Sequence, residues 1–141
     1  MKMTWSNYSG VDDFTGHYGF IYQLTYDDGS MYVGKKSFIS TRKKPFGKKK
    51  LAEVTDARKK KYEVIVTDSN WREYEGSCKN IGSRKLVSKE IIHLCKAKQD
   101  LSYWENYYLY KMKVLFDIFY LNENIEGRYF AGRLTGSKEI K

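Results

Sequence analysis

The chain has 141 residues, of which 41% are hydrophobic and 16% aromatic, and its formal net charge is +9. This length accommodates one domain with a hydrophobic core, and the hydrophobic content excludes an intrinsically disordered chain. The positive charge favours an anionic partner, nucleic acid first and an anionic membrane second. We therefore expect a single domain over residues 1–141 that binds a polyanion.

The sequence gives no sign of a membrane-spanning, secreted or zinc-binding protein. No apolar run reaches the roughly 18 residues that a membrane span needs, and the first residues lack the apolar core of a signal peptide. Cys78 and Cys95 form no CxxC pair, which argues against both a zinc site and a disulfide scaffold. We expect two free thiols and a cytoplasmic location.

Strand signals come early in the chain. Residues 18–26 and 31–36 are rich in aromatic and β-branched residues and flank a glycine-containing turn, which predicts a hairpin. Residues 62–67 and 88–97 carry further short strand-like apolar runs. Between the hairpin and residue 62, the dense basic run over 40–61 predicts solvated loops or helix faces.

Two helices are predicted. A short one is expected after Asp68 and Ser69, because both are good N-caps. A longer one covers residues 100–116, where apolar residues recur every three to four positions. These apolar residues are Leu101, Trp104, Tyr108, Met112 and Leu115. Residues from Asn122 onward are polar and irregular.

The order of these elements indicates an α+β fold. We expect a small antiparallel sheet of about three strands flanked by helices. The core of the domain should cover about residues 18–125, with a basic insert at about residues 40–75.

The register of the first hairpin decides whether Tyr22 and Tyr32 share one face of the sheet. A two-residue loop, Asp28-Gly29, places them on opposite faces, because side chains alternate along a strand. A three-residue loop that begins at Asp27 places Tyr22 opposite Gly34 and both tyrosines on one face. Gly34 would then leave room beside Tyr22 for a phosphate or a water. The alternative is that both tyrosines are ordinary cross-strand packing.

These features resemble the GIY-YIG nuclease superfamily, and more narrowly its small phage-encoded members. Phe20-Ile21-Tyr22 stands where the first triplet belongs, with Phe replacing Gly and with Gly19 just before it. Tyr32-Val33-Gly34 stands for the second triplet, and Glu105 and Asn122 follow in the expected order. The segments YVGKKSF, TRKKP and SNWREYEGS extend the resemblance, which covers roughly residues 18–125.

The resemblance implies a metal-dependent DNA endonuclease in which a tyrosine is the base, an arginine contacts the phosphate and a glutamate holds a divalent metal. The catalytic residues would be Tyr22, Tyr32, Arg42, Glu105 and Asn122, with Mg²⁺ (or Mn²⁺) bound by Glu105. A single carboxylate is sufficient for Mg²⁺, which keeps several waters. A tyrosine base needs a lowered pKa, and we expect nearby cations such as Lys35 and Lys36 to lower it.

Several assignments stay open. Arg42 lies eight residues after Gly34, whereas Arg58 has Tyr62 four residues on, and Arg72 is a third candidate. Asn124 competes with Asn122.

A further group of residues is expected to contact DNA, mostly through its phosphates. They are Lys35, Lys36, Lys43, Lys44, Lys48, Lys49, Lys50, Arg58, Trp71 and Arg72. Trp71 either stacks on DNA or anchors the short predicted helix. His93, on a predicted strand, is expected to be partly buried and hydrogen-bonded rather than a ligand.

The partner implied is double-stranded DNA, with no membrane, and the protein would be a monomer or a transient dimer in the cytoplasm, that of the host if it is phage-encoded. It would be a site-specific endonuclease or nickase, homing-like or acting on invader or host DNA. The alternative is a noncatalytic nucleic-acid-binding module with a nuclease-like fold.

Overall fold

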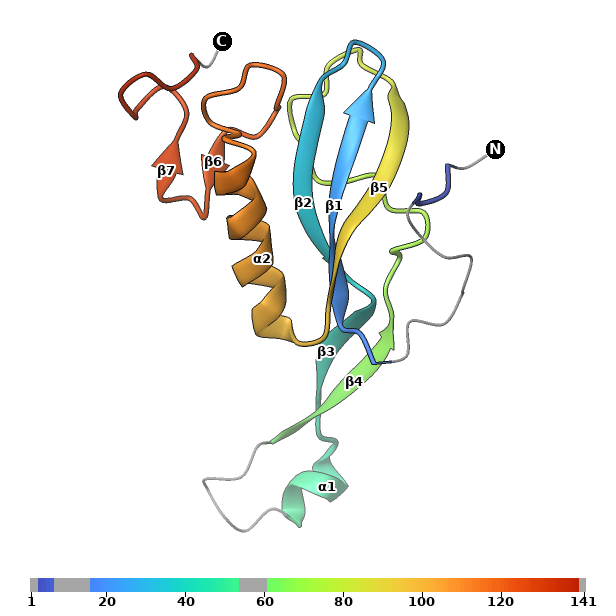
Figure 1. Ribbon diagram of the computed structural model, residues 1–141. Coiled ribbons are helices and arrows are strands. Elements are labelled where there is room, and N and C mark those ends of the chain that lie inside the picture. Colours follow the sequence, from blue (N-terminus) through green and yellow to red (C-terminus); the bar gives the residue numbers. More distant parts are fainter. Residues whose placement is uncertain (1–2, 7–15, 54–60, 140–141) are drawn as a thin grey trace. The chain divides into compact units, whose positions relative to one another are not determined.

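The computed structural model describes residues 3–6, 16–53 and 61–139 (Figure 1). The chain separates into two compact units: unit 1 is Met1–Phe38 with Asn70–Lys141, and unit 2 is Ile39–Ser69. Unit 2 therefore coincides with most of the predicted basic insert, although it ends at Ser69 rather than near residue 75. No helix within the described ranges is long and apolar enough to cross a membrane.

Unit 1 is built on a three-stranded antiparallel sheet in the order β2-β1-β5. The strands are β1 (Gly19–Tyr26), β2 (Met31–Ser37) and β5 (Leu86–Cys95). The central strand β1 is buried at six of its eight positions because both of its faces are covered. This architecture confirms the predicted α+β fold with a small antiparallel sheet.

The register of the β1–β2 hairpin is the one that a three-residue loop requires. Tyr22 pairs with Gly34, and Leu24 pairs with Tyr32. Gly29 has a φ of +86°, the left-handed conformation that glycine adopts without strain. Tyr22 and Tyr32 therefore share one face of the sheet, as predicted.

Helix α2 (Lys98–Lys111) covers one face of the sheet, where its buried residues Leu101 and Leu109 pack against Ile21 and Val33 (Figure 1). At its start, Asp100 Oδ2 accepts a hydrogen bond of 3.2 Å from the Ala97 backbone N–H.

The helix is shorter at its C-terminal end than the predicted range of 100–116. Lys113 adopts a left-handed φ of +50°, which turns the chain and buries Val114 and Leu115.

An aromatic cluster covers the other face of the sheet. Phe20 and Tyr22 pack there with Trp5, Phe38 and Trp71. The Trp5 indole N–H donates a 2.7 Å hydrogen bond to the Trp71 backbone carbonyl. The predicted short helix after residues 68 and 69 is wrong, because residues 71–73 form only a turn. Burial of Trp71 in the cluster orders this segment without a helix.

Unit 2 is a two-stranded antiparallel ribbon of β3 (Ile39–Pro45) and β4 (Tyr62–Asp68), with the short helix α1 (Lys48–Ala52) between them. Strand β4 confirms the strand predicted at 62–67. The basic run was expected to form only solvated loops or helix faces, and its first part is instead strand β3. The charged composition of β3 does not predict a strand, but its backbone is hydrogen-bonded to β4.

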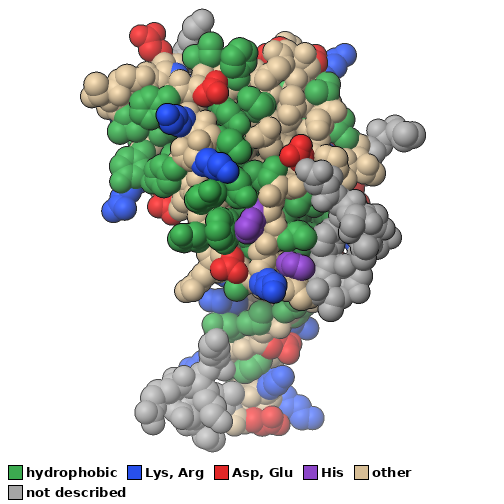
Figure 2. All heavy atoms as spheres, in the orientation of Figure 1, with side chains coloured by type: hydrophobic (Ala, Val, Ile, Leu, Met, Phe, Trp, Pro, Cys, Tyr) green, Lys and Arg blue, Asp and Glu red, His purple; other side chains and the backbone are tan. Residues whose placement is uncertain are grey.

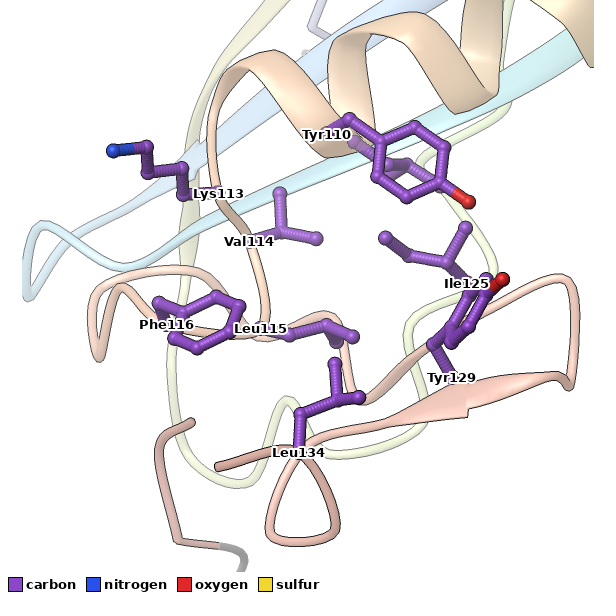
Figure 3. A pocket seen from close by; sticks show the side chains of 9 residues that line it. Tyr110, Lys113, Val114, Leu115, Phe116, Ile125, Tyr129 and Leu134 are labelled. Atoms are coloured by element: carbon purple, nitrogen blue, oxygen red, sulfur yellow. The ribbon is translucent and has the colours of Figure 1, made fainter. Parts of the chain in front are cut away.

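The C-terminal part contains a hairpin of β6 (Asn124–Ile125) and β7 (Tyr129–Phe130), where the sequence predicted irregular structure. Figure 3 shows how Ile125 and Tyr129 close an apolar pocket of about 270 Å³ with Val114 and Leu134. The pocket is lined almost entirely by hydrocarbon, so it offers little for polar chemistry.

Candidate active site

The polar cleft of unit 1 has a volume of about 560 Å³. Its walls come from β2, from α2, from residues 77–80 and from residues 121–127. Tyr32, Glu105 and Asn122 all line the cleft and come from three separate parts of the sequence. The cleft thus brings together three of the five predicted catalytic residues.

Glu105 is a largely buried carboxylate with incomplete charge compensation. Its side chain is 21% exposed, and its Oε1 lies 3.9 Å from the Lys35 Nζ. Burial raises the pKa of Glu105, the Lys35 ammonium group opposes this shift, and the Glu126 carboxylate raises the pKa further. Lys35 also donates a hydrogen bond of 3.0 Å to Ser102 Oγ, which fixes it beside the cleft. A cation bound at Glu105 would offset the cost of burying its negative charge and would reduce the repulsion between the Glu105 and Glu126 carboxylates.

Tyr32 is the tyrosine that faces the cleft. Its hydroxyl lies 3.4 Å from the Ser77 Oγ. Burial raises the pKa of Tyr32, the Ser77 hydrogen bond lowers it, and the Glu105 carboxylate is among the groups that raise it. The phenol therefore carries its proton at neutral pH and is electrostatically coupled to Glu105.

Tyr22 lies behind Tyr32 and is fully buried. Its ring centroid is 6.4 Å from that of Tyr32 and 6.0 Å from that of Tyr74. Within the described residues, its hydroxyl makes no hydrogen bond of good geometry, although the Tyr74 and Ser77 hydroxyls lie close enough to affect its pKa. Burial, followed by the neighbouring Tyr74 and Tyr32, raises the pKa of Tyr22 far above its usual value.

The expectation that Lys35 and Lys36 lower the pKa of Tyr22 is therefore wrong. Lys36 Nζ instead lies 4.2 Å from the centroid of the Tyr74 ring, and Lys35 is engaged with Glu105.

Gly34 makes room for Tyr22 itself. A Cβ atom at Gly34 would lie 2.5 Å from Tyr22 Cζ. The space expected for a phosphate or a water is thus filled by the phenol ring.

Asn122 is buried, and its amide is bound to the backbone of β2. Its Oδ1 accepts a hydrogen bond of 3.1 Å from the Val33 N–H, and its Nδ2 donates one of 2.9 Å to the Val33 carbonyl. Asn124 instead accepts a hydrogen bond from the Gly127 N–H in the β6–β7 turn. Asn122 therefore fixes the second triplet beside the cleft, whereas Asn124 stabilises a turn.

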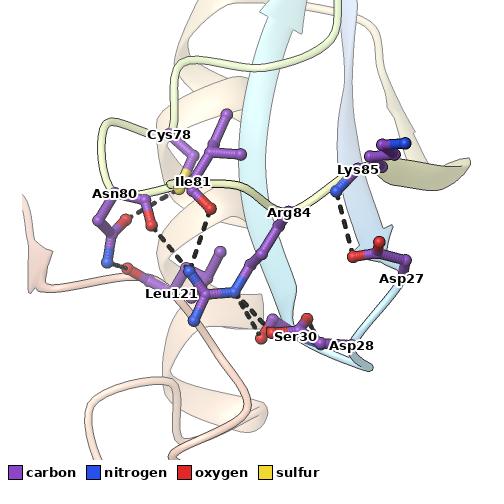
Figure 4. Close-up of polar contacts among 9 residues, drawn as sticks. All are labelled: Asp27, Asp28, Ser30, Cys78, Asn80, Ile81, Arg84, Lys85 and Leu121. Carbon is purple, nitrogen blue, oxygen red and sulfur yellow. Dashed lines mark hydrogen bonds and ion pairs between the residues drawn. The ribbon is translucent and has the colours of Figure 1, made fainter.

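Arg84 ties one wall of the cleft to the tip of the β1–β2 hairpin (Figure 4). Its Nε lies 2.7 Å from Asp28 Oδ2 and donates to Ser30 Oγ at 3.1 Å, while its Nη1 donates to the carbonyls of Asn80 and Ile81. Sequence reasoning missed this arginine, because its partners are far away in the chain. It missed Ser77 and Glu126 for the same reason.

The basic residues predicted to contact DNA divide between the two units. Arg42, Lys43 and Lys44 lie exposed on β3, and Lys48, Lys49 and Lys50 lie exposed on α1. Arg58 falls outside the described residues. In unit 1, Arg72 is exposed and lies 4.5 Å from the Trp71 ring centroid. Trp71 is only 4% exposed, which favours its role as an anchor over the predicted stacking on DNA.

His93 is partly buried and stacks on Trp104 with ring centroids 4.4 Å apart, as expected for a structural histidine. The face that carries the histidines is rich in hydrophobic side chains (Figure 2). The chain also exposes Tyr103, Tyr107 and Tyr110 along the outside of α2, away from Glu105.

The sequence model of a family described as "Putative endonuclease segE, GIY-YIG domain" matches residues 4–125. The chain belongs to this GIY-YIG family. The match spans most of the chain and confirms the resemblance to GIY-YIG nucleases. No curated protein and no solved structure matches the chain.

The first triplet of this chain has Phe20 in place of the glycine that the GIY-YIG name implies, and the structure shows how both Gly19 and Phe20 are packed. A Cβ atom at Gly19 would lie 2.5 Å from the Lys36 carbonyl oxygen and 2.9 Å from Leu101 Cδ2. Gly19 therefore permits the close approach of β1 to β2 and α2. Phe20, next to it, is fully buried in the aromatic cluster. The departure from the family pattern is thus accommodated by packing.

Proposed function

We propose that this GIY-YIG domain is a metal-dependent DNA endonuclease that hydrolyses a phosphodiester bond at the cleft of Tyr32 and Glu105. The observation that carries the proposal is that these two side chains line one polar cleft and are electrostatically coupled. A metal-binding carboxylate beside a phenol is a combination that phosphodiester hydrolysis can use.

The residues of the cleft fit Mg²⁺ or Mn²⁺. Within the described ranges, no group of three or more histidine, cysteine or acidic side chains could hold a metal, which argues against zinc. Glu105 and Glu126 both line the cleft, and the negative charge of Glu126 raises the pKa of Glu105. Carboxylate oxygens such as those of Glu105 and Glu126, completed by water and phosphate, suit Mg²⁺.

Glu105 is proposed as the metal ligand. A divalent cation held there would supply positive charge beside the phosphate and would lower the pKa of neighbouring water and phenol groups.

Tyr32, rather than Tyr22, is proposed to accept the proton of the attacking water. Tyr32 would first lose its own proton to solvent. The water oxygen then bonds to phosphorus, the water proton passes to the Tyr32 phenolate oxygen, and the leaving deoxyribose oxygen takes a proton from solvent water as the P–O bond breaks. Tyr32 is in the cleft, while the hydroxyl of Tyr22 is enclosed by protein. Tyr22 is proposed to position Tyr32 by packing behind it.

Arg42 is proposed to neutralise the charge that develops on the phosphate. It is an exposed residue of β3, and guanidinium groups bind phosphate in a bidentate manner. Asn122 is proposed to hold the backbone of Val33, next to Tyr32, rather than to contact substrate. Lys35, Lys36 and Arg72 are proposed to contact the phosphates of double-stranded DNA.

One site per chain cuts one strand, so double-strand cleavage would require a transient dimer or two successive nicks. We propose a protein of the cytoplasm, that of the host if it is phage-encoded.

The test is cleavage of supercoiled plasmid and of the native target genome, with Mg²⁺ and with EDTA. We expect wild type to produce nicked or linear DNA, and we expect Glu105→Ala and EDTA to abolish it. Tyr32→Phe should lower the rate by about 10²–10⁴-fold.

Tyr22→Phe is the matched control, because it keeps the packed ring and removes only a buried hydroxyl that does not line the cleft, so it should leave the rate close to that of wild type. Cleavage by Glu105→Ala, or a larger loss in Tyr22→Phe than in Tyr32→Phe, would contradict these assignments. DNA binding without cleavage of either substrate would favour a noncatalytic module.

A further inference from the structure

Unit 2 is an exposed β-ribbon whose two faces differ in chemistry. Directly opposed residues of an antiparallel pair share a face, and successive residues alternate between faces. The pairs Thr41–Val66 and Lys43–Val64 therefore lie on one face, which we call the valine face. Arg42 pairs with Ile65 on the opposite face.

The valine face exposes apolar groups to solvent. Val64 is 52% exposed and Val66 is 57% exposed, and Thr41 beside them is also exposed. Lys43 stays on this face, with its Nζ 4.7 Å from the centroid of the Tyr62 ring. A two-stranded ribbon by itself is marginally stable in water, so exposed valines add nothing to its stability unless a partner covers them.

The charge of unit 2 identifies the partner. Its 31 residues contain ten lysines and arginines and four acidic residues, so it carries a net charge of +6 of the chain's +9. A polyanion is the complementary partner. The major groove of DNA is about 12 Å wide and admits a two-stranded ribbon, and apolar side chains there contact the methyl group of thymine.

We propose that the β3–β4 ribbon enters the major groove of duplex DNA with the valine face toward the base edges, and that it confers a sequence preference. Thr41, Val64 and Val66 contact base edges, while Lys43 and the α1 lysines contact the flanking phosphates. Arg42 lies on the opposite face of the ribbon and does not take part in this contact. This inference rests on the proposed function because it takes DNA as the substrate. Its test measures DNA binding alone and does not depend on cleavage.

The ribbon can be removed without opening the core of unit 1. Phe38 and Trp71, on either side of the insert, are 6% and 4% exposed, and their ring centroids are 5.0 Å apart. A variant in which residues 39–69 are replaced by a short Gly/Ser linker should therefore fold, and a thermal melt checks this.

The experiment measures binding in EDTA, so that its result does not depend on cleavage. Wild type is used to select bound sequences from a pool of random duplex DNA, and affinity is measured as a function of salt concentration. We expect wild type to enrich a short motif. The ribbon-less variant should bind at least about tenfold more weakly, and its salt dependence should flatten by about 0.9 in log–log slope for each phosphate that the protein no longer neutralises.

The double variant Val64→Thr/Val66→Thr keeps β-branched side chains and removes only their apolar character. It should lose the motif while its affinity for the unselected pool changes less than about threefold. Val87→Thr is the matched control, because Val87 is 53% exposed on β5 in unit 1. It should bind like wild type. The double variant also tests the proposal if the ribbon-less variant does not fold.

The proposal would be overturned if wild type enriches no motif, if the double variant enriches the same motif as wild type, or if a folded ribbon-less variant binds DNA unchanged. Binding to anionic phosphatidylserine vesicles in place of DNA would also overturn it. If wild type selects a motif that depends on the ribbon but cleaves no DNA, the proposed nuclease function is contradicted and the proposal for the ribbon stands.

Discussion

Replacing Gly34 by alanine tests whether the contact between the two triplets determines the packing of this fold. The added Cβ would lie 2.5 Å from Tyr22 Cζ, whereas carbon atoms in contact are about 3.5–4.0 Å apart. The Tyr22 ring would have to move by about 1 Å to restore that separation. Trp5 and Tyr74 hinder this movement, since their ring centroids are 5.5 Å and 6.0 Å from that of Tyr22.

The expected cost follows from this confinement. Overpacking a core costs about 1–3 kcal/mol, and a confined ring with no exposed surface belongs at the upper end, about 2–3 kcal/mol. For a domain of this size, that corresponds to a decrease in melting temperature of about 6–12 °C. Thermal unfolding followed by circular dichroism measures it. Gly47→Ala is the control, because a Cβ there meets nothing within 4 Å.

Truncation of the tyrosine should remove the clash. Tyr22→Leu lacks the Cζ atom, so Gly34→Ala should cost markedly less free energy of unfolding in that background than in wild type. The two substitutions would then show a coupling of at least about 1 kcal/mol. Full additivity, or a Gly34→Ala variant as stable as wild type, would refute the conclusion that Tyr22 fills the space above Gly34.

Three other substitutions test the cleft. Asn122→Ala leaves both backbone groups of Val33 unpaired and should cost about 2–4 kcal/mol in urea unfolding, against less than about 1 kcal/mol for Asn124→Ala. Glu105→Gln should raise the melting temperature at pH 8 but not in acid, because burial raises the folded-state pKa of Glu105 and stability is lost as it ionises with rising pH. A variant that melts below wild type at pH 8 would contradict this. Glu126→Gln should lower the pKa of Glu105 and move the acidic limb of the cleavage pH profile to lower pH, and an unmoved limb would exclude the coupling.

The local parts of this fold follow from the sequence. Asp28 and Gly29 predict a hairpin turn but allow a loop of two or of three residues, and the structure shows the three-residue loop, with Gly29 in the left-handed conformation and Tyr22 opposite Gly34. The periodic apolar residues of α2 predict a helix that carries Glu105, because a 3.6-residue repeat needs no knowledge of the rest of the chain. The order of the triplets, the helix and Asn122 is also enough to suggest the GIY-YIG family.

Only the tertiary structure decided what surrounds each side chain. The observed register places Tyr22 and Tyr32 on one face, but burial by Trp5 and Tyr74 removes the Tyr22 hydroxyl from solvent and leaves Tyr32 at the cleft. The pKa of a phenol or a carboxylate depends on the dielectric and on charges a few ångströms away. Those charges, such as Glu126 beside Glu105, come from distant parts of the chain, and no local spacing encodes their approach.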